Sequence, residues 1–404
     1  MDQFKILRAE ITLDILTRLP TESVFDCKLV CTDWRNLISH HPSFSKMHLH
    51  HLNHHFTADD SGKLDFIVVT KDRSYFGDHE NLQYFEIHES TTPTIQRISR
   101  VNFTQPFEHF KIVGSCDGLI CLIRLYRSAT QPVCICNPVT RQYVVLPEID
   151  CDTDDDDVNW TFGFGYVSST NEYKVVAIHW LNKEFIQAQI YTLGSGNGWK
   201  NLGNFSSQFT GDWICILCVQ AIFADGALYW LDIVSNMVVS FNLADEKFCA
   251  HLSPPPLPPD NDFWYNRLGV LGGFLYFAVP QVVEEAICYD IWLLKKKNGN
   301  QDMEEQLEEH QSLGWNKKFR INEIDLFAVT KSDSVLTYYD NYLRIYDTKS
   351  STSKSLVDFK EQISIVFPYK STLVSLNELG EEHTKRMESI EIEETWKAII
   401  SLQL

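Results

Sequence analysis

A repeating unit with a period of about 50 residues is the feature that most constrains the fold of this chain. Each unit holds an extended stretch rich in β-formers, a tight polar turn and a second extended stretch. One anchor position taken from each unit gives Glu86, Asn137, Thr192, Asn242, Leu293 and Asp347, with steps of 51, 55, 50, 51 and 54 residues. Such a period, with several strands per unit, is typical of β-propeller blades. The sequence therefore predicts a mainly β fold with about six blades.

The ends of the β-rich region set the expected domain limits. Alternating apolar runs begin near position 63, and the stretch SIVFPYKSTLVSL at 364–376 is the expected closing strand, because an open ring would leave strand edges exposed. The propeller is thus predicted over 63–377. A charged tail follows at 378–404, either mobile or lying on the rim, and the fifth unit carries an insertion at 296–314.

The first fifty residues do not show this strand pattern and are predicted to form three short helices. Ile11, Ile15 and Leu19 form an apolar stripe at helical spacing, and Pro20 stops the run. A second helix begins near Thr21, and Thr32 is the expected cap of a third. A bundle of this size has too many large apolar side chains to bury them all internally. Either another protein or the β-domain itself is expected to cover them.

A histidine-rich connector is expected between these two parts. The stretch 40–62 is polar and holds seven histidines, and 51–62 is predicted as the connector between the two domains. The histidines have no accompanying carboxylate at metal-site spacing, so a solvated connector is favoured over a metal site.

Composition narrows the partners and the compartment. The net charge is 35 − 54 = −19, which disfavours nucleic acid and anionic lipid and favours a neutral or basic partner. The start MDQFKILRAE does not resemble a secretory signal, and the apolar run at 213–224 is shorter than the ~20 residues of a membrane span. Eleven cysteines, mostly in apolar patterns, suit reduced thiols in the cytoplasm or nucleus.

No chemical motif outweighs its structural explanation. The pair Cys215 and Cys218 lies in a buried-strand pattern without a second pair, so neither a metal nor another cofactor is predicted. Gly163 and Gly165 lack the third glycine of a dinucleotide site and indicate close strand packing instead. GSGNGW at 194–199 reads as a hairpin, and no catalytic set is evident, since His109, His179, His251 and His310 stand in unrelated contexts.

An acidic run at 151–157 is a charged segment with a candidate role, and the insertion at 296–314 is a second candidate for contacts with a target. The acidic run lacks the spacing of a calcium loop, so a solvated loop is the first interpretation. The other is a contact for a basic target protein, which makes Asp154, Asp155, Asp156 and Asp157 weak candidates for target binding.

The N-terminal residues resemble a known family. LxxEIxxxILxRLP from Leu7 to Pro20, followed by Val30, Trp34 and PSFSKMHL at 42–49, is similar to an F-box over positions 1–50, with Arg8 where the family usually has proline. The resemblance implies docking on a Skp-type adaptor, and through it on a cullin and a RING protein. Together with the apolar stripe, it gives the expected adaptor-binding residues, which are Leu7, Ile11, Ile15, Leu16, Leu19, Pro20, Val30 and Trp34.

The β-region resembles the kelch-like interaction domain of plant F-box proteins. The segments that carry this likeness are GSCDGLICL at 114–122, NPVTRQYVVLP at 137–147 and FGFGYVSSTNEYKVV at 162–176. The resemblance implies a non-catalytic receptor subunit of an SCF-type ubiquitin ligase that holds a target protein. The alternatives that remain are an interaction scaffold not coupled to a ligase, and an enzyme whose site is assembled from loops.

Overall fold

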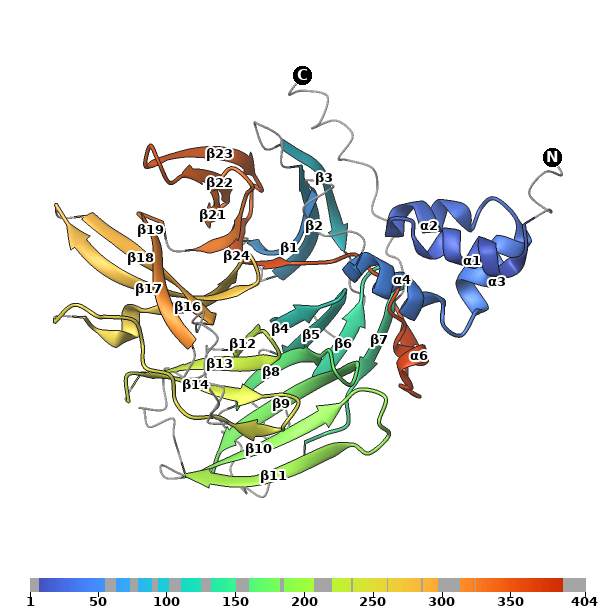
Figure 1. The fold of residues 1–404 in the computed structure, drawn as a ribbon, viewed down its shortest axis with the longest axis horizontal. Coiled ribbons are helices and arrows are strands. Elements are labelled where there is room, and N and C mark those ends of the chain that lie inside the picture. The colour runs from blue at the N-terminus through green and yellow to red at the C-terminus, as the bar shows by residue number, and fades with distance from the viewer. Residues whose placement is uncertain are drawn as a thin grey trace, which may run out of the picture.

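A bundle of short helices stands beside six β-sheets that are arranged around a common centre (Figure 1). The computed structural model describes residues 7–54, 63–72, 79–88, 94–101, 110–124, 132–149, 160–181, 185–206, 220–233, 235–259, 261–284, 286–296, 313–323 and 325–387. No helix within these ranges is long and apolar enough to cross a membrane.

The three predicted helices are present, and a fourth follows them. They are α1 (Ala9–Thr17), α2 (Thr21–Cys27), α3 (Thr32–His40) and α4 (Phe44–His54). Pro20 separates α1 from α2 as expected, because its ring cannot continue the first helix. The cap of α3 is Cys31 and not Thr32: the Cys31 sulfur accepts a hydrogen bond from the backbone N–H of Trp34 at 3.5 Å.

The fourth helix corrects the expectation for the histidine-rich stretch. The connector was predicted as solvated from position 40, but 44–54 form α4, in which Phe44, His48, Leu49 and Leu52 are buried. These positions follow the i, i+4, i+5, i+8 spacing of one helix face. The many histidines made this segment polar in composition, so its apolar helix face was not recognised from the sequence. Residues 55–62 of the predicted connector lie outside the described residues.

Each of the six sheets contains one four-stranded antiparallel blade, and the sheet of blade 2 gains a fifth strand from the C-terminal segment. Blade 1 holds β24 (Gln362–Pro368), β1 (Lys63–Asp72), β2 (His79–His88) and β3 (Thr94–Val101). Blade 2 holds β4 (Phe110–Cys116), β5 (Leu119–Arg124), β6 (Val133–Asn137) and β7 (Gln142–Val145), and blade 3 holds β8 (Trp160–Val167), β9 (Glu172–Trp180), β10 (Phe185–Thr192) and β11 (Trp199–Ser206).

The remaining three blades follow the same order. Blade 4 holds β12 (Ile222–Ala224), β13 (Ala227–Asp232), β14 (Met237–Asn242) and β15 (Lys247–Phe248). Blade 5 holds β16 (Arg267–Leu271), preceded by the short helix η3 (Phe263–Tyr265), then β17 (Phe274–Val283), β18 (Ala286–Lys296) and β19 (Leu313–Ile321). Blade 6 holds β20 (Leu326–Val329), β21 (Val335–Tyr339), β22 (Tyr342–Asp347) and β23 (Thr352–Asp358).

The predicted propeller of about six blades is confirmed, and the repeat anchors occupy equivalent positions in the six blades. Every anchor lies in the third strand of its blade, from Glu86 in β2 of blade 1 to Asp347 at the end of β22. Closure follows the prediction as well, although the closing strand ends at Pro368 and the rest of the expected stretch, 369–376, is not strand. β24 pairs with β1 in antiparallel register, with Val366 opposite Val68, so the last strand of the ring completes the first blade.

Close packing between blades explains the glycines of β8. A Cβ on Gly163 would lie 2.5 Å from Leu228 Cδ1, and one on Gly165 would lie 2.4 Å from a ring carbon of Phe223. Atoms that close would have to move apart, which confirms that these glycines serve strand contact. The stretch GSGNGW forms the turn between β10 and β11, as predicted.

Part of the predicted tail is folded onto the propeller. α6 (Leu376–Leu379) is followed by β25 (Lys385–Arg386), which pairs with the outer strand β7 of blade 2. Glu381 is buried there and accepts hydrogen bonds from the hydroxyl of Tyr191 at 3.2 Å and from the backbone N–H of Gly194 at 2.7 Å. Residues 388–404 lie outside the described residues.

The alternation of the strands defines two faces. Connections between first and second strands and between third and fourth strands lie at one face, which we call the F-face. The turn at Asp117 and the turn after Asn137 belong to it. Connections between second and third strands and between successive blades lie at the opposite face, called the far face, as at Tyr339 and Tyr342.

Candidate functional site

The N-terminal helices expose a group of large apolar side chains. Leu29 is 78% exposed and Val30 56% exposed, both in the turn between α2 and α3. Ile11 and Ile15 on α1, and Leu7 just before it, are each more than two fifths exposed. Fully burying such a side chain contributes about 1.5–3 kcal/mol. A surface of this kind in a bundle that is otherwise packed is typical of an interaction site.

The other predicted adaptor residues form the support of that surface. Leu16 is fully buried in the helical core, and Leu19 and Trp34 pack against this core while partly exposed. Pro20 is exposed between α1 and α2. The eight residues thus divide into exposed side chains and side chains that hold the helices together. Their contact with an adaptor remains a prediction.

One exposed residue was not found from the sequence. Leu29 is the most exposed large apolar side chain among the described residues, but it stands after the last turn of α2 and outside the helical stripe. The dipeptide formed by Leu29 and Val30 was the available signal, since two adjacent apolar residues in a turn cannot both face the core.

The backbone at Arg8 has the geometry that a proline would impose. Arg8 precedes α1 with φ −63° and ψ 150°, and a proline ring fixes φ near −65°. The start of α1 therefore reaches this conformation without the proline that the pattern usually has. The hydroxyl of Thr12 donates to the carbonyl of Arg8 at 3.2 Å, which holds the first turn against it.

His48 connects α4 to the end of α1. The side chain is buried, and its Nε2 lies 2.8 Å from the carbonyl oxygen of Leu19, so the ring donates there as the neutral Nε2–H tautomer. Burial lowers the pKa of His48, and the charges of His51 and Lys370 lower it further, while the carbonyl of Leu19 and the carboxylate of Glu22 raise it. This buried imidazole fixes one side of the helical bundle.

A segment from the end of the chain fixes the bundle to the propeller. We call residues 369–375, between β24 and α6, the strap. The hydroxyl of Thr21 donates to the carbonyl oxygen of Ser371 at 2.7 Å, and the Lys370 ammonium donates to the side-chain oxygen of Asn53. Leu373 of the strap is buried in the helical core itself, against residues such as Leu16 and Phe44.

The strap is held to blade 2 from the other side. The amide of Asn137 donates to the carbonyl oxygen of Val374 at 2.8 Å and to that of Thr372 at 3.2 Å, and the Thr372 hydroxyl donates to the carbonyl of Asp117 at 2.6 Å. Burial raises the pKa of the Asp117 carboxyl, while nearby Lys370 lowers it. Because the strap contacts both parts, the helices are mounted on the F-face at blade 2.

The far face carries its own exposed apolar side chains on neighbouring blades. In blade 5, Val282 is 77% exposed and stands directly opposite Ile287, also exposed, near the end of the β17–β18 hairpin. In blade 6, Tyr339 and Tyr342 form an equivalent exposed pair at the β21–β22 turn. We call these four residues the far-face pairs. They lie on the face opposite to the helices.

Several predicted features are placed elsewhere or fall outside the described ranges. The acidic run with Asp154, Asp155, Asp156 and Asp157, the pair Cys215 and Cys218, and most of the 296–314 insertion lie outside the described residues, as do His109 and His310. His179 is buried in β9, apart from the half-buried His251. Among the residues that are described, no group of three His, Cys, Asp or Glu side chains is placed to hold a metal ion.

Comparison with known proteins agrees with this architecture. Residues 9–46 match the F-box domain, and residues 67–354, well over half of the chain, match the F-box associated beta propeller domain. An F-box/kelch-repeat protein of Arabidopsis thaliana is 26% identical over 300 residues, covering 72% of this chain and 76% of the relative. An F-box protein of the same plant is 25% identical over 319 residues, covering 72% and 69%. The chain therefore belongs to the family of F-box proteins that carry an F-box associated β-propeller.

Proposed function

We propose that this protein is the substrate-recognition subunit of an SCF-type ubiquitin ligase. Its F-box docks on a Skp-type adaptor, which links it to a cullin and a RING protein, and its propeller binds the target. The observation that carries this proposal is the exposed apolar surface of Leu7, Ile11, Ile15, Leu29 and Val30 on an F-box whose remaining apolar side chains are packed. Burial of several such side chains suffices for a stable interface.

The protein itself performs no bond chemistry in this proposal. It contributes proximity, because a target held near the charged conjugating enzyme presents its lysines at a high effective concentration. The strap supports such a role, since it ties the helices to blade 2 through Thr21 and Leu373 and so limits how far the two binding surfaces move relative to each other.

The target is proposed to bind the far face. The far-face pairs Val282 with Ile287 and Tyr339 with Tyr342 are exposed there, and the net charge of −19 favours a target with basic as well as apolar side chains. Asp154 to Asp157 remain weak candidates for contacts to such a target. We further propose that the protein resides in the cytoplasm or nucleus, which is supported by free buried thiols such as Cys121, Cys134 and Cys136.

Two substitutions on opposite surfaces test the proposal. Val30→Asp places a charge in the F-box surface and is expected to weaken binding to the purified Skp-type adaptor at least tenfold in calorimetry. Val282→Asp makes the same change on the far face and is expected to leave adaptor binding as it is. Targets are identified as proteins that accumulate when this protein is deleted. The Val282→Asp variant is expected not to capture these targets, whereas Val30→Asp is expected to capture them.

The outcome also decides between the ligase subunit and an uncoupled scaffold. If the unmodified protein does not bind the adaptor, or if Val30→Asp binds it as tightly as the unmodified protein, the F-box surface has another role. The protein is then better described as an interaction scaffold that is not coupled to a ligase.

A further inference from the structure

A cavity of about 630 Å³ runs along the propeller axis. First strands of the blades line it, chiefly β4, β12, β16, β20 and β24, so its wall is assembled from segments more than 250 positions apart. Gly114 in β4, Ala221 just before β12 and Gly269 in β16 are among the small residues of this wall. The volume is within the range of about 300–1,000 Å³ that is usual for small-molecule sites.

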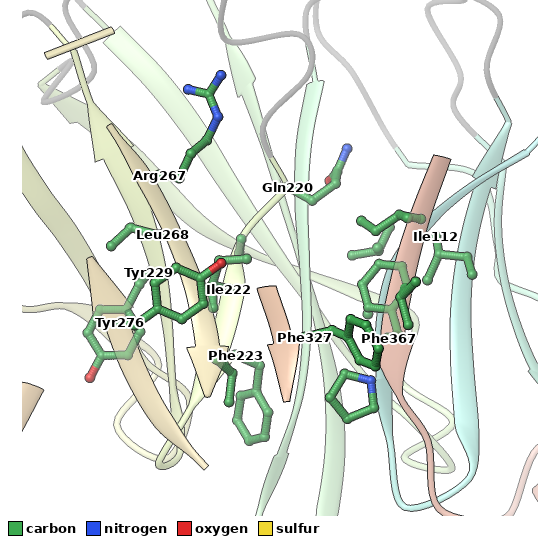
Figure 2. Close-up of a pocket in the computed structure, with 18 of the residues that line it drawn as sticks. Ile112, Gln220, Ile222, Phe223, Tyr229, Arg267, Leu268, Tyr276, Phe327 and Phe367 are labelled. Atoms are coloured by element: carbon green, nitrogen blue, oxygen red, sulfur yellow. The ribbon is translucent and has the colours of Figure 1, made fainter. Parts of the chain in front are cut away.

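The wall of the cavity is mainly apolar. Figure 2 shows Ile222, Leu268, Phe327 and Phe367 around the space, with Phe223 at one end. Tyr229 and Tyr276 add aromatic surface, and Tyr276 is nearly fully buried. A wall of this composition favours a ligand with an apolar or aromatic body, because such a body displaces water from apolar surface.

Polar groups gather at the other end. In Figure 2 the guanidinium of Arg267 and the side-chain amide of Gln220 extend beyond the apolar side chains. Both residues stand at or just before the start of a first strand, which is the far-face end of the cavity. Arg267 Nη1 donates to the carbonyl oxygen of Asn266 at 2.9 Å, and Gln220 Oε1 accepts from the backbone N–H of Phe162 at 2.9 Å. The second bond aims the amide NH₂ of Gln220 away from β8.

The local charge is opposite in sign to that of the whole chain. The charged residues that line the cavity are Lys111, Arg267 and Asp325, which sum to +2 − 1 = +1, whereas the chain carries −19. Asp325 stands at the same end, where burial raises the pKa of its carboxyl and the charge of Arg267 lowers it, so the net charge of +1 there depends on Lys111 together with Arg267. A net positive end of an apolar cavity in an acidic protein favours an anionic group at that place. Arginine is well suited to a carboxylate, because its planar guanidinium matches the two carboxylate oxygens.

We propose that the axial cavity binds a carboxylate carried on an apolar body, with the carboxylate at Arg267 and Gln220 and the body between Leu268, Ile222 and Phe327. The carboxylate is that of a small aryl or alkyl acid or the C-terminus of a peptide with an apolar last residue. This site goes beyond target binding at the far-face pairs and does not depend on the F-box.

The experiment compares acids with their neutral amides on the purified full-length protein. The probes are 3-phenylpropanoate and 4-phenylbutanoate against the corresponding amides, and a heptapeptide ending in Phe with a free C-terminus against the same peptide amidated. Calorimetry is expected to show that at least one acid binds ten times or more tightly than its amide. The small acids and the peptide distinguish the two sources of the carboxylate.

Three variants link the binding to the cavity. Arg267→Gln keeps a polar side chain of similar length without the charge and is expected to reduce acid binding at least tenfold with little effect on the amide. Leu268→Trp fills the cavity and is expected to abolish binding of both; if it does not fold, Ile222→Phe is the milder filling variant. Arg124→Gln removes an exposed arginine at the end of β5, outside the cavity wall, and is expected to change nothing.

The proposal is overturned if no acid binds better than its amide. It is equally overturned if Arg267→Gln binds the acids as tightly as the unmodified protein, or if Arg124→Gln weakens them to the same degree. None of these readouts involves the adaptor, so failure here leaves the proposed ligase function standing, and loss of adaptor binding leaves this site standing.

Discussion

Thr21 and Ser371 are 350 positions apart in the chain, yet the hydroxyl of Thr21 donates to the carbonyl oxygen of Ser371 at 2.7 Å. Thr21 begins α2 of the F-box and is buried, and Ser371 belongs to the strap that leaves the closing strand. The contact means that the N-terminal helices and the segment after the closing strand stabilise each other. Completion of the propeller and seating of the F-box are therefore coupled.

Removing this hydroxyl is expected to loosen the F-box. Thr21→Val preserves the shape but leaves the carbonyl of Ser371 without its donor, which costs about 1–3 kcal/mol for a buried group. Hydrogen exchange is expected to be faster in α2 while the blades are unchanged. Thr32→Val, at an exposed position of α3, is the matched control and is expected to leave exchange unaltered. Equal exchange in both variants would show that the bond does not hold the F-box.

Neighbouring residues of α1 are expected to separate stability from adaptor binding. Leu16→Ala empties a fully buried site and is expected to lower the free energy of unfolding by about 2–5 kcal/mol. Ile15→Ala, at an exposed position, is expected to change stability by less than about 0.5 kcal/mol and to weaken adaptor binding instead. Thermal melting and calorimetry measure the two effects. Ile15→Ala with full adaptor affinity would remove α1 from the proposed interface.

Three chain lengths are expected to distinguish closure from the strap. A chain ending at Glu361 lacks β24, so β1 has an unpaired edge in blade 1, and we expect aggregation and no sharp melting. A chain ending at Pro368 keeps β24 but lacks the strap. It is expected to stay soluble and to melt cooperatively, but at a lower temperature than the full-length protein. A chain ending at Met387 keeps every described element and is expected to melt as the full-length protein does. A sharp transition in the shortest chain would contradict closure by β24.

The stability of the F-box is expected to fall in acid because of His48. The pKa of His48 is lowered in the folded protein, mainly by burial, from about 6.5 in the unfolded chain. The unfolded state then binds more protons, so the stabilisation is fully present above pH 6.5 and is lost as the pH falls toward and below the folded pKa.

A substitution on α4 isolates this effect. His48→Gln retains a side-chain donor toward Leu19 without a titrating group, and is expected to flatten the pH dependence of unfolding between pH 7 and 5. His50→Gln, at an exposed position of the same helix, is expected to keep the dependence of the unmodified protein. Chemical denaturation at a series of pH values measures both. An unchanged slope in His48→Gln would assign the dependence to other groups.

The sequence by itself determined the repeat, the closing strand and the first three helices. These features are local, because strand alternation, helical spacing and turn residues are written within a few positions of one another. Gly163 and Gly165 were identified in the same way, since a glycine inside a strand indicates close approach of a neighbour. The anchors from Glu86 to Asp347 fell in equivalent strands because each blade repeats the same local pattern.

Only the tertiary structure decided which segments distant in the sequence contact each other. His48 reads as one of seven solvated histidines until Leu19 and the α4 face bury it, and Leu373 reads as part of a strand until it enters the helical core. Arg267 carries no motif, and it gains its place only when the first strands of separate blades enclose the axial cavity. Such contacts depend on surfaces that meet after each blade has formed, and no local pattern encodes which surfaces will meet.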